Sequence, residues 1–174
     1  IASSCTVSRD KTGRYFISFV TEVQTPLTLP PHKSIGMDLG LTHFATLSDG
    51  EKIENPRHLL RLENKLKAAQ RALSTKKKGS RNRAKARLRV ARIHARIADA
   101  RRDFAHKLST RLIRENQAIG LESLDVRKML KQRRLAKGIS DASWSSFTSM
   151  LEYKAQWHQR EVVFVDRFFP STKM

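Results

Sequence analysis

The segment from Ser34 to Thr42, SIGMDLGLT, indicates the fold class of this 174-residue chain. Its large apolar residues alternate with glycines and with one acid, Asp38, which is a strand pattern. Residues 42–47 and 51–54 predict two further strands, connected by a turn at residues 49–50. The segment therefore predicts three consecutive strands, the first of which contains a carboxylate.

Two later segments have the same strand character. Residues 118–121 (AIGL) are apolar and end at a second acid, Glu122, and residues 162–165 (VVFV) predict the last strand. Between them, Asp141 is placed to cap a helix, and the acid-free stretch 127–137 is expected to form a loop. Strands that alternate with helices in this way predict an α/β fold with a mixed sheet.

The helix predicted after the cap has an apolar face that is rich in aromatic residues. Trp144 and Phe147 belong to this face and are expected in the core. Tyr153 and Trp157, at i and i+4, are also expected in the core. In an earlier helix, His106 is expected to be a partly buried histidine and not a metal ligand.

The N-terminal part predicts a separate, small β element. Residues 6–9 and 14–23 are β-rich and flank DKTG at 10–13, a good hairpin turn. Residues 25–31 contain three prolines and predict a linker. A short β-hairpin is therefore expected to precede the main sheet.

The composition excludes several classes of protein. The chain has 35 Lys and Arg against 16 Asp and Glu, a net charge of +19, and a pI near 11.0. Its one cysteine, Cys5, rules out a disulfide framework and a cysteine zinc site within this chain. No apolar run approaches the roughly 18 residues of a membrane span. Such a charge favours a polyanionic partner, nucleic acid first and an anionic membrane second.

Nearly all of this charge lies in residues 57–116, which hold 20 basic and 4 acidic residues, a net of +16. Asn55-Pro56 is a helix start signal, and apolar residues then recur every three to four positions on either side of KKKGS at 76–80. A glycine at such a break suits a chain reversal. The block therefore predicts an antiparallel helical hairpin with one apolar seam and basic outer faces.

An ordinary solvated helix mixes charges of both signs, but here a long basic run contains no acid. Self-repulsion of this kind is costly unless phosphates neutralise it, so contact with a nucleic-acid backbone is predicted. The predicted contact residues are Lys76, Lys77, Lys78, Arg81, Arg83, Lys85, Arg87, Arg89 and Arg92, with Arg96 continuing the run and Arg133 and Arg134 in a later basic stretch.

Two carboxylates, Asp38 and Glu122, stand out because each interrupts or ends an apolar strand. Burying an ionised carboxylate is expensive unless a cation or a hydrogen-bond donor compensates it. On neighbouring strand ends, the two acids could share Mg²⁺ ions in a site for phosphodiester cleavage. The alternative is that each acid caps a helix or pairs with an arginine, and sequence spacing alone does not decide between the two.

Further motifs surround these acids. GMDLGLT at 36–42 is followed by a predicted β-hairpin, the basic block and IGLESL at 119–124. In chain order the others are KKKGS at 76–80, DFAHKLS at 103–109, RRLA at 133–136, ISDASW at 139–144, LEYKA at 151–155 and FFPSTK at 168–173. Taken together, over residues 34–174, they resemble the RuvC-like nuclease domain of the TnpB family, the transposon-encoded OrfB proteins related to type V CRISPR effectors.

The resemblance implies an RNase H-like (RuvC) fold, RNA-guided cleavage of DNA, and guide RNA and target DNA as partners. Asp38 and Glu122 would be the first two catalytic acids and ligands of Mg²⁺ or Mn²⁺. The basic block would hold guide RNA or the RNA–DNA duplex by its backbone. Residues 1–31 would end a β-rich wedge domain and its linker, and residues 32–174 would form the nuclease domain, into which 57–116 is inserted.

The family continues past the position of Met174 into a four-cysteine zinc element and a third catalytic Asp. Zinc is therefore expected only beyond residue 174. Asp166 is a poor substitute for the third acid because it is predicted on the last strand, 161–167, and not on a following helix. We therefore expect this chain to bind nucleic acid but to cleave DNA weakly or not at all. The expected location is the prokaryotic cytoplasm, at the nucleoid.

Two other functions compete with this interpretation. DLGLT at 38–42 also fits a phosphate loop of actin-like ATPases, but such a short pattern is weak evidence and no second glycine-rich phosphate loop follows. A non-catalytic, architectural nucleic-acid-binding protein is the stronger rival. It would keep the basic hairpin and use Asp38 and Glu122 only structurally.

Overall fold

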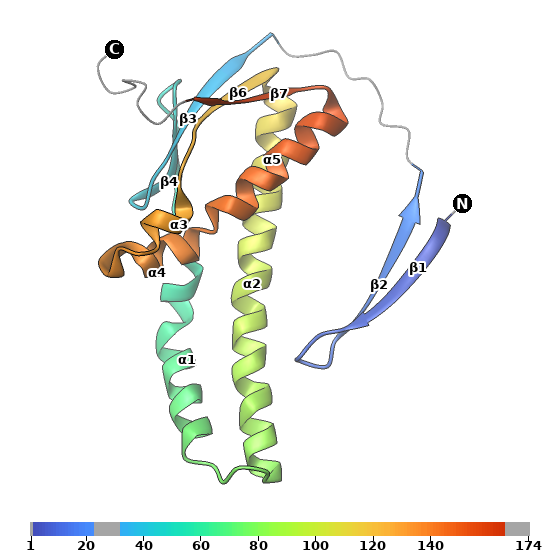
Figure 1. Cartoon of the computed structure of the whole chain (residues 1–174), viewed down its shortest axis with the longest axis vertical. Helices are drawn as coiled ribbons and strands as arrows, with labels where there is room; N and C mark the ends of the chain where they lie inside the picture. Colours follow the sequence, from blue (N-terminus) through green and yellow to red (C-terminus); the bar gives the residue numbers. More distant parts are fainter. Residues whose placement is uncertain (1, 23–31, 166–174) are drawn as a thin grey trace. The chain divides into compact units, whose positions relative to one another are not determined.

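The computed structural model describes residues 2–22 and 32–165 (Figure 1). The elements are β1 (Ala2–Arg9), β2 (Tyr15–Thr21), β3 (Ser34–Leu39), β4 (His43–Leu47), β5 (Lys52–Glu54), α1 (His58–Ser74), α2 (Arg81–Glu115), β6 (Ala118–Glu122), α3 (Val126–Met129), α4 (Arg133–Ala142), α5 (Trp144–His158) and β7 (Glu161–Val165). They form two compact units: a helical unit of residues 1–26 and 58–100, and a sheet unit of residues 27–57 and 101–174. Helix α2 contributes its first part to the helical unit and its last part to the sheet unit.

The helical unit contains the predicted β-hairpin, in which β1 and β2 pair antiparallel. The turn forms because the Asp10 carboxylate accepts hydrogen bonds from the Thr12 hydroxyl (2.6 Å) and from the backbone N–H groups of Thr12 (2.8 Å) and Arg14 (3.0 Å). These bonds, above all that from the Thr12 hydroxyl, hold the pKa of Asp10 well below its usual range. Gly13 completes the turn at φ 89°. The predicted hairpin is confirmed, and every residue of both strands is exposed.

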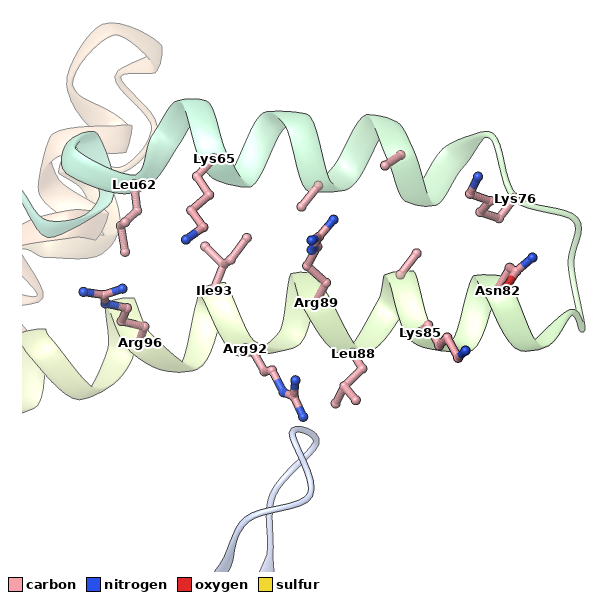
Figure 2. A pocket seen from close by; sticks show the side chains of 13 residues that line it. Leu62, Lys65, Lys76, Asn82, Lys85, Leu88, Arg89, Arg92, Ile93 and Arg96 are labelled. Atoms are coloured by element: carbon pink, nitrogen blue, oxygen red, sulfur yellow. The ribbon is translucent and has the colours of Figure 1, made fainter.

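The same unit contains the predicted helical hairpin of α1 and the first part of α2. Its seam buries Leu66 and Ala69 of α1 against Ile93 and Ile97 of α2. Figure 2 shows Leu62 and Ile93 in the space between the two antiparallel helices. The seam covers only part of α2, because α2 has 35 residues and α1 has 17. The last part of α2 therefore packs in the sheet unit, which the prediction of a single seam did not foresee.

The sheet unit is built on five strands in the order β5-β4-β3-β6-β7. Strand β4 is antiparallel to both β3 and β5, whereas β6 is parallel to both β3 and β7. Parallel neighbours need a long crossover connection, and the chain supplies one in the helices between β5 and β6 and another in those between β6 and β7. The predicted α/β class with a mixed sheet is confirmed.

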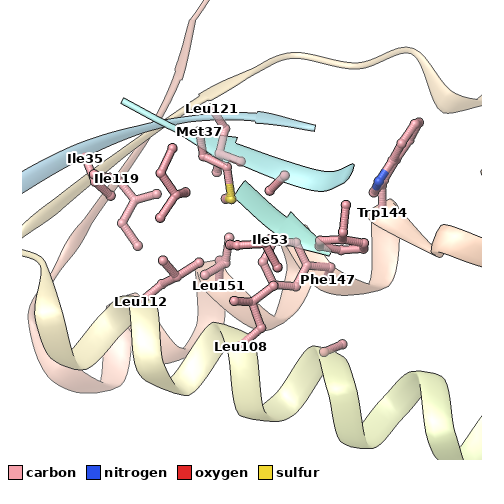
Figure 3. Packing of buried hydrophobic residues seen from close by; sticks show 14 of the residues in the cluster. Ile35, Met37, Ile53, Leu108, Leu112, Ile119, Leu121, Trp144, Phe147 and Leu151 are labelled. Atoms are coloured by element: carbon pink, nitrogen blue, oxygen red, sulfur yellow. The ribbon is translucent and has the colours of Figure 1, made fainter. Parts of the chain in front are cut away.

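One face of this sheet is covered by helices, and the main core lies there. Buried side chains alternate along β3 and β6, where Ile35 and Met37 lie beside Ile119 and Leu121. Figure 3 shows these side chains directed toward Leu108 and Leu112 of α2 and toward Phe147 and Leu151 of α5. Because strand side chains alternate between faces, the residues between the buried ones lie on the opposite face of the sheet.

Two local predictions are wrong. Residues 127–137 are not a loop but include most of α3 and the first half of α4. Asp141 is not a helix cap. It lies near the end of α4, where its Oδ1 accepts hydrogen bonds from Arg101 Nε (2.8 Å) and Nη2 (2.7 Å). The cap position before α5 is taken by Ser143 at φ 54°. Asp141 pairs with Arg101, which lies 40 residues earlier in the sequence, and the local sequence pattern around Asp141 does not indicate this partner.

The aromatic residues of α5 divide between core and surface. Trp144 and Phe147 are buried, as predicted, and Phe44 contacts Phe147 edge to face. Trp157 is 64% exposed, contrary to the prediction, and its ring contacts the half-buried Tyr153 edge to face (4.7 Å between ring centroids). The predicted linker at 25–31 lies outside the described residues.

Candidate metal site and nucleic-acid interface

The two predicted acids come together through the register of β3 and β6. These strands pair in parallel, with Gly36 beside Gly120 and Met37 beside Leu121. Continuing the register by one residue places Asp38 beside Glu122 at the same end of the two strands. Parallel neighbours lie about 4.8 Å apart, so the two carboxylates leave adjacent backbone positions. Both lie on the face of the sheet opposite the helices, since Met37 and Leu121 are buried on the other face.

A pocket of about 350 Å³ opens on this face of the sheet unit. Asp38 is exposed and Glu122 is half-buried. The neighbouring strand β4 contributes Thr46, which pairs directly with Asp38. The residues lining the pocket are Gly36, Met37, Asp38, Thr46, Leu47, Ser48, Gly120, Leu121, Glu122 and Val165.

The chemistry of this pocket suits a hard cation. Within the described part of the chain, neither Asp38 nor Glu122 forms a salt bridge, so the alternative that each pairs with an arginine does not hold there. Two carboxylates and nearby hydroxyl groups offer oxygen ligands, which Mg²⁺ and Ca²⁺ prefer. Residues 2–22 and 32–165 contain no group of three or more His, Cys, Asp or Glu side chains that could hold a metal ion. Asp166 lies outside those ranges.

The basic residues form a surface of their own in the helical unit. A groove of about 960 Å³ runs along α1 and α2 (Figure 2). Its floor is apolar, with Leu62 and Ile93, and its basic lining consists of Lys65, Lys76, Lys85, Arg89, Arg92 and Arg96. We call this surface the basic groove. Most of the predicted contact residues are exposed, whether they line the groove or lie beside it as Lys77, Lys78, Arg81 and Arg87 do.

One predicted contact residue has a structural role, and one lining residue was not predicted. Arg83 is half-buried, and its Nη1 donates to the carbonyl oxygens of Leu73 (3.2 Å) and Lys76 (2.9 Å). The guanidinium therefore bonds one carbonyl in the last turn of α1 and one in the connection that follows it. Lys65 was not predicted because it belongs to α1, where Glu63 and Lys67 form an ion pair (2.6 Å) and the charge pattern is mixed.

An ion pair marks the end of the acid-free run. Asp99 is the first acid after that run, and it accepts hydrogen bonds from Arg14 Nη1 (2.6 Å) and Nη2 (3.4 Å). Arg14 also bonds Asp10 (2.8 Å). These bonds, first that to Asp99, raise the pKa of Arg14 above its usual range. The β-hairpin thus neutralises Asp99, the acid that follows the basic run.

Arg133 and Arg134 are exposed at the start of α4. They belong to the sheet unit, whereas the basic groove belongs to the helical unit. Neither unit by itself brings the two sets of basic residues together.

The sheet unit also buries a cation that the sequence did not single out. Lys154 of α5 is 7% exposed, and its Nζ donates to the His106 carbonyl (2.9 Å) and to the hydroxyls of Ser109 (2.7 Å) and Thr110 (2.7 Å). Desolvation by burial lowers the pKa of Lys154. His106 is half-buried, as predicted, and its pKa is lowered first by burial and then by the nearby charge of Lys154. This cluster lies on the helix side of the sheet and fastens α5 to α2.

Comparison with protein families gives two matches. The family OrfB_IS605, described as "Probable transposase", matches residues 18–133. A second family, described as "Cas12f1-like, TNB domain", matches residues 144–174.

Curated relatives give a consistent picture. The chain is 52% identical to a protein of Streptomyces pristinaespiralis named "Putative RNA-guided DNA endonuclease", over 99% of this chain and 43% of the relative. It is 34% identical to a protein of Mycobacterium tuberculosis with a name of the same kind, over 82% of this chain and 34% of the relative. It is 31% identical to InsQ of Escherichia coli, again named as such an endonuclease, over 99% of this chain and 47% of the relative. The chain spans less than half the length of these relatives.

Proposed function

Because this chain belongs to the OrfB_IS605 family of probable transposases, we propose that it is the nucleic-acid-binding and metal-binding part of an RNA-guided DNA endonuclease. The register that places Asp38 beside Glu122 is the observation that carries the proposal. Two acids separated by 84 positions in the sequence meet at one end of two parallel strands, on the face opposite the one that α2 and α5 cover.

The proposed fold of the sheet unit is RNase H-like, of the RuvC type. Support comes from the strand order β5-β4-β3-β6-β7, in which an antiparallel set of three strands continues into two parallel ones. The long helical crossover between β5 and β6 corresponds to the predicted insertion at 57–116. The proposed division into a wedge end at 1–31 and a nuclease domain at 32–174 rests on the family resemblance.

The proposed metal is Mg²⁺ or Mn²⁺, held by Asp38 and Glu122. The donor set fits such an ion because it consists of oxygen atoms on an open face, with the Thr46 hydroxyl on the adjacent strand. When bound, the metal would supply the charge that activates water and stabilises the leaving oxygen in phosphodiester hydrolysis.

The residues of the chain have separate tasks in this proposal. Asp38 and Glu122 stand on paired strands, so the sheet fixes the backbone positions from which the two carboxylates project. The basic groove neutralises phosphates along a nucleic-acid backbone without reading its sequence. Mg²⁺ demands six ligands, and two carboxylates leave most of them to water, so we expect this chain to hold the metal weakly and to cleave DNA slowly.

The rival function is an architectural RNA- or DNA-binding protein without catalysis. The basic groove favours it as much as it favours the endonuclease, because phosphate contacts serve both. The two functions differ only in what Asp38 and Glu122 do.

Calorimetry with Mn²⁺ on the purified 174-residue chain distinguishes these functions. We expect Asp38→Ala and Glu122→Ala each to lower Mn²⁺ affinity by about tenfold or more, since each removes a charged ligand. Asp103→Asn is the matched control, because Asp103 is an exposed acid paired with Lys107 outside the pocket. Its Mn²⁺ affinity should equal that of the unchanged chain.

Three results would contradict part or all of the proposal. Equal Mn²⁺ affinity in the unchanged chain and in Asp38→Ala would favour the architectural function. Failure of the unchanged chain to bind an RNA–DNA duplex would contradict both functions. Fast Mg²⁺-dependent cleavage by the 174-residue chain, abolished by Asp38→Ala, would support the endonuclease but contradict the expected slow cleavage.

A further inference from the structure

Two glycines lie side by side beneath the paired carboxylates. Gly36 of β3 and Gly120 of β6 are register partners, two residues before Asp38 and Glu122 on the same face of the sheet. Both line the pocket of about 350 Å³. A glycine in the interior of a strand weakens the strand, because it loses more conformational freedom on folding than other residues and packs no side chain. Two adjacent glycines in paired strands therefore call for a reason.

Backbone conformation does not require either glycine. The glycines with positive φ are Gly13, Gly50 and Gly79, which lie in turns. Gly36 and Gly120 have strand conformations that any residue adopts.

Packing within the described protein does not require them either. A Cβ atom on Gly36 would lie 3.5 Å from the Ser48 Cβ, and one on Gly120 would lie 3.9 Å from the Ile35 carbonyl oxygen. These are ordinary van der Waals distances. Gly40 provides the contrast, because a Cβ atom there would come within 3.1 Å of the His43 carbonyl oxygen. Alanine would therefore fit at 36 and 120, so neither the backbone nor the packing of the described residues gives a reason for glycine there.

We propose that Gly36 and Gly120 form a glycine floor on which the sugar–phosphate backbone of a DNA strand lies, with one phosphate directed toward Asp38 and Glu122. The floor is a positioning element for the strand, and this inference rests on the proposed metal site. A missing Cβ on a strand commonly marks the close approach of a ligand or another backbone. A methyl group at either position would lift the strand away from the carboxylates.

The chemistry of the pocket favours a phosphate backbone as the occupant. Asp38 and Glu122 stand two residues beyond the glycines, and a phosphate can approach two carboxylates when a divalent cation lies between them. The chain carries +19, most of it in residues 57–116, and this charge attracts polyanions to the protein. The pocket lining itself contains two acids and no basic residue, so a divalent cation would neutralise the phosphate there. A neutral or acidic peptide segment on the floor would make no use of the two carboxylates.

The proposed metal site itself supplies a probe that does not depend on catalysis. Fe²⁺ replaces Mg²⁺, and added ascorbate and hydrogen peroxide generate hydroxyl radicals at the ion, which break a DNA backbone only close to it. The 174-residue chain is bound to end-labelled single-stranded DNA of mixed sequence. Breaks above those seen with Asp38→Ala report a strand lying at the carboxylates.

The variants are Gly36→Ala, Gly120→Ala and the double substitution, and Ser34→Thr is the matched control. Ser34 is exposed on the same face of β3, two residues before Gly36 and outside the pocket lining, so it also gains one methyl group. We expect the glycine variants to unfold at the same temperature as the unchanged chain or higher. Their Mn²⁺ affinity and total DNA affinity should stay within about twofold, since the basic groove dominates DNA binding. Their specific breaks should fall by about fivefold or more, whereas Ser34→Thr keeps them.

The possible failures are distinguishable. Unchanged breaks in the double glycine variant would overturn the glycine floor and leave the metal site intact. Mn²⁺ binding without specific breaks in the unchanged chain would overturn it as well, because no strand would then lie at the carboxylates. Equal Mn²⁺ affinity in the unchanged chain and Asp38→Ala would refute the proposed function, and the glycine floor with it.

Discussion

Lys154 is a lysine buried in the sheet unit that uses all three of its hydrogen-bond donors. Its partners are one carbonyl and two hydroxyl oxygens, those of His106, Ser109 and Thr110. Burying an ammonium group is costly, as the lowered pKa of Lys154 reflects. The three hydrogen bonds of the charged donor offset this desolvation cost. Because part of their free energy is used in this way, Lys154 stabilises the α2–α5 contact less than its bonds alone suggest.

Truncation of Lys154 therefore separates packing from charge. We expect Lys154→Ala to lower the free energy of unfolding by about 2–3 kcal/mol, because it leaves a cavity and unpaired oxygens. Lys154→Met should cost no more than about 1 kcal/mol, since it keeps the aliphatic volume and removes the desolvated charge. Ser109 retains its bond to the Ala105 carbonyl (2.7 Å) in both variants. Urea unfolding followed by circular dichroism measures the difference. An equal loss in both variants would show that the hydrogen bonds dominate.

His106 predicts a dependence of stability on pH. Burial, Lys154 and Arg102 lower its pKa in the folded chain, and Asp103 opposes them. The unfolded chain therefore binds the proton more readily than the folded chain at pH values below about 6.5. The stabilisation is present above pH 6.5 and is lost as pH falls toward the folded-state pKa. Urea unfolding at about pH 7.5 and pH 5.5 should show a smaller decrease for His106→Gln than for the unchanged chain. A decrease of the same size in both proteins would contradict this prediction.

At the scale of elements, the α1–α2 hairpin combines a small apolar seam with a dense basic surface. Leu66, Ala69, Ile93 and Ile97 hold the two helices together. The basic side chains of the groove then lie close to one another without acids between them. Their mutual repulsion is relieved when phosphates bind, and the released counterions make binding depend on salt.

The salt dependence of nucleic-acid binding tests the basic groove. We expect the slope of log affinity against log salt to decrease in magnitude by about 2 in the double variant Arg89→Gln/Arg92→Gln, which removes two phosphate contacts. The control is Lys52→Gln/Lys131→Gln, which lowers the net charge equally at exposed positions outside the groove. Fluorescence anisotropy at several salt concentrations provides the measurement. An equal change in slope for both pairs would indicate a diffuse charge effect without a groove.

At the scale of the whole molecule, the chain contains two units with cores of very different size. The core of the sheet unit has 17 buried residues, whereas that of the helical unit has four. The β-hairpin of the helical unit is exposed on both faces, and an isolated two-stranded sheet has little stability of its own. Stability is therefore expected to differ between the units.

Amide hydrogen exchange measures this difference along the chain. We expect peptides from β1, β2 and residues 58–92 to exchange faster than peptides from β3, β6 and α5, by about tenfold or more. A saturating RNA–DNA duplex should slow exchange in α1 and the first part of α2, and added salt should reverse the effect. Uniform exchange across both units would contradict the expected difference.

The sequence predicts those features that depend on local pattern. Strand alternation at 34–39 and 118–122, the turn at Asp10 and the apolar stripes of α1 and α2 all appear in the structure. A stretch in which basic residues dominate was misread. The basic stretch 127–137 looked like a loop, but much of it is helical because residues such as Val126, Met129 and Ile139 pack on the distant core.

Roles that depend on distant partners were also missed. The exposure of Trp157, the half-buried position of Asp141 and the burial of Lys154 follow from how α2, α4 and α5 meet. Arg83 matched the pattern of a phosphate contact, yet it bonds the carbonyls of Leu73 in α1 and of Lys76 after α1. Helical periodicity indicates the face of the helix on which a residue lies, but it does not indicate which other element packs against that face.

The sequence by itself determined the family, the α/β class, the position of the charge and the two carboxylates as candidates. Composition and periodicity suffice for these features because they are local properties of the chain. Only the tertiary structure decided that Asp38 and Glu122 stand on adjacent strands, that Gly36 and Gly120 lie open beneath them, and that the uncovered face of the sheet holds all four. The physical reason is that strand register is fixed by the burial of Ile35, Met37, Ile119 and Leu121 against α2 and α5. A slip of one residue would turn both carboxylates into that core, so the packing of the core sets the geometry of the site.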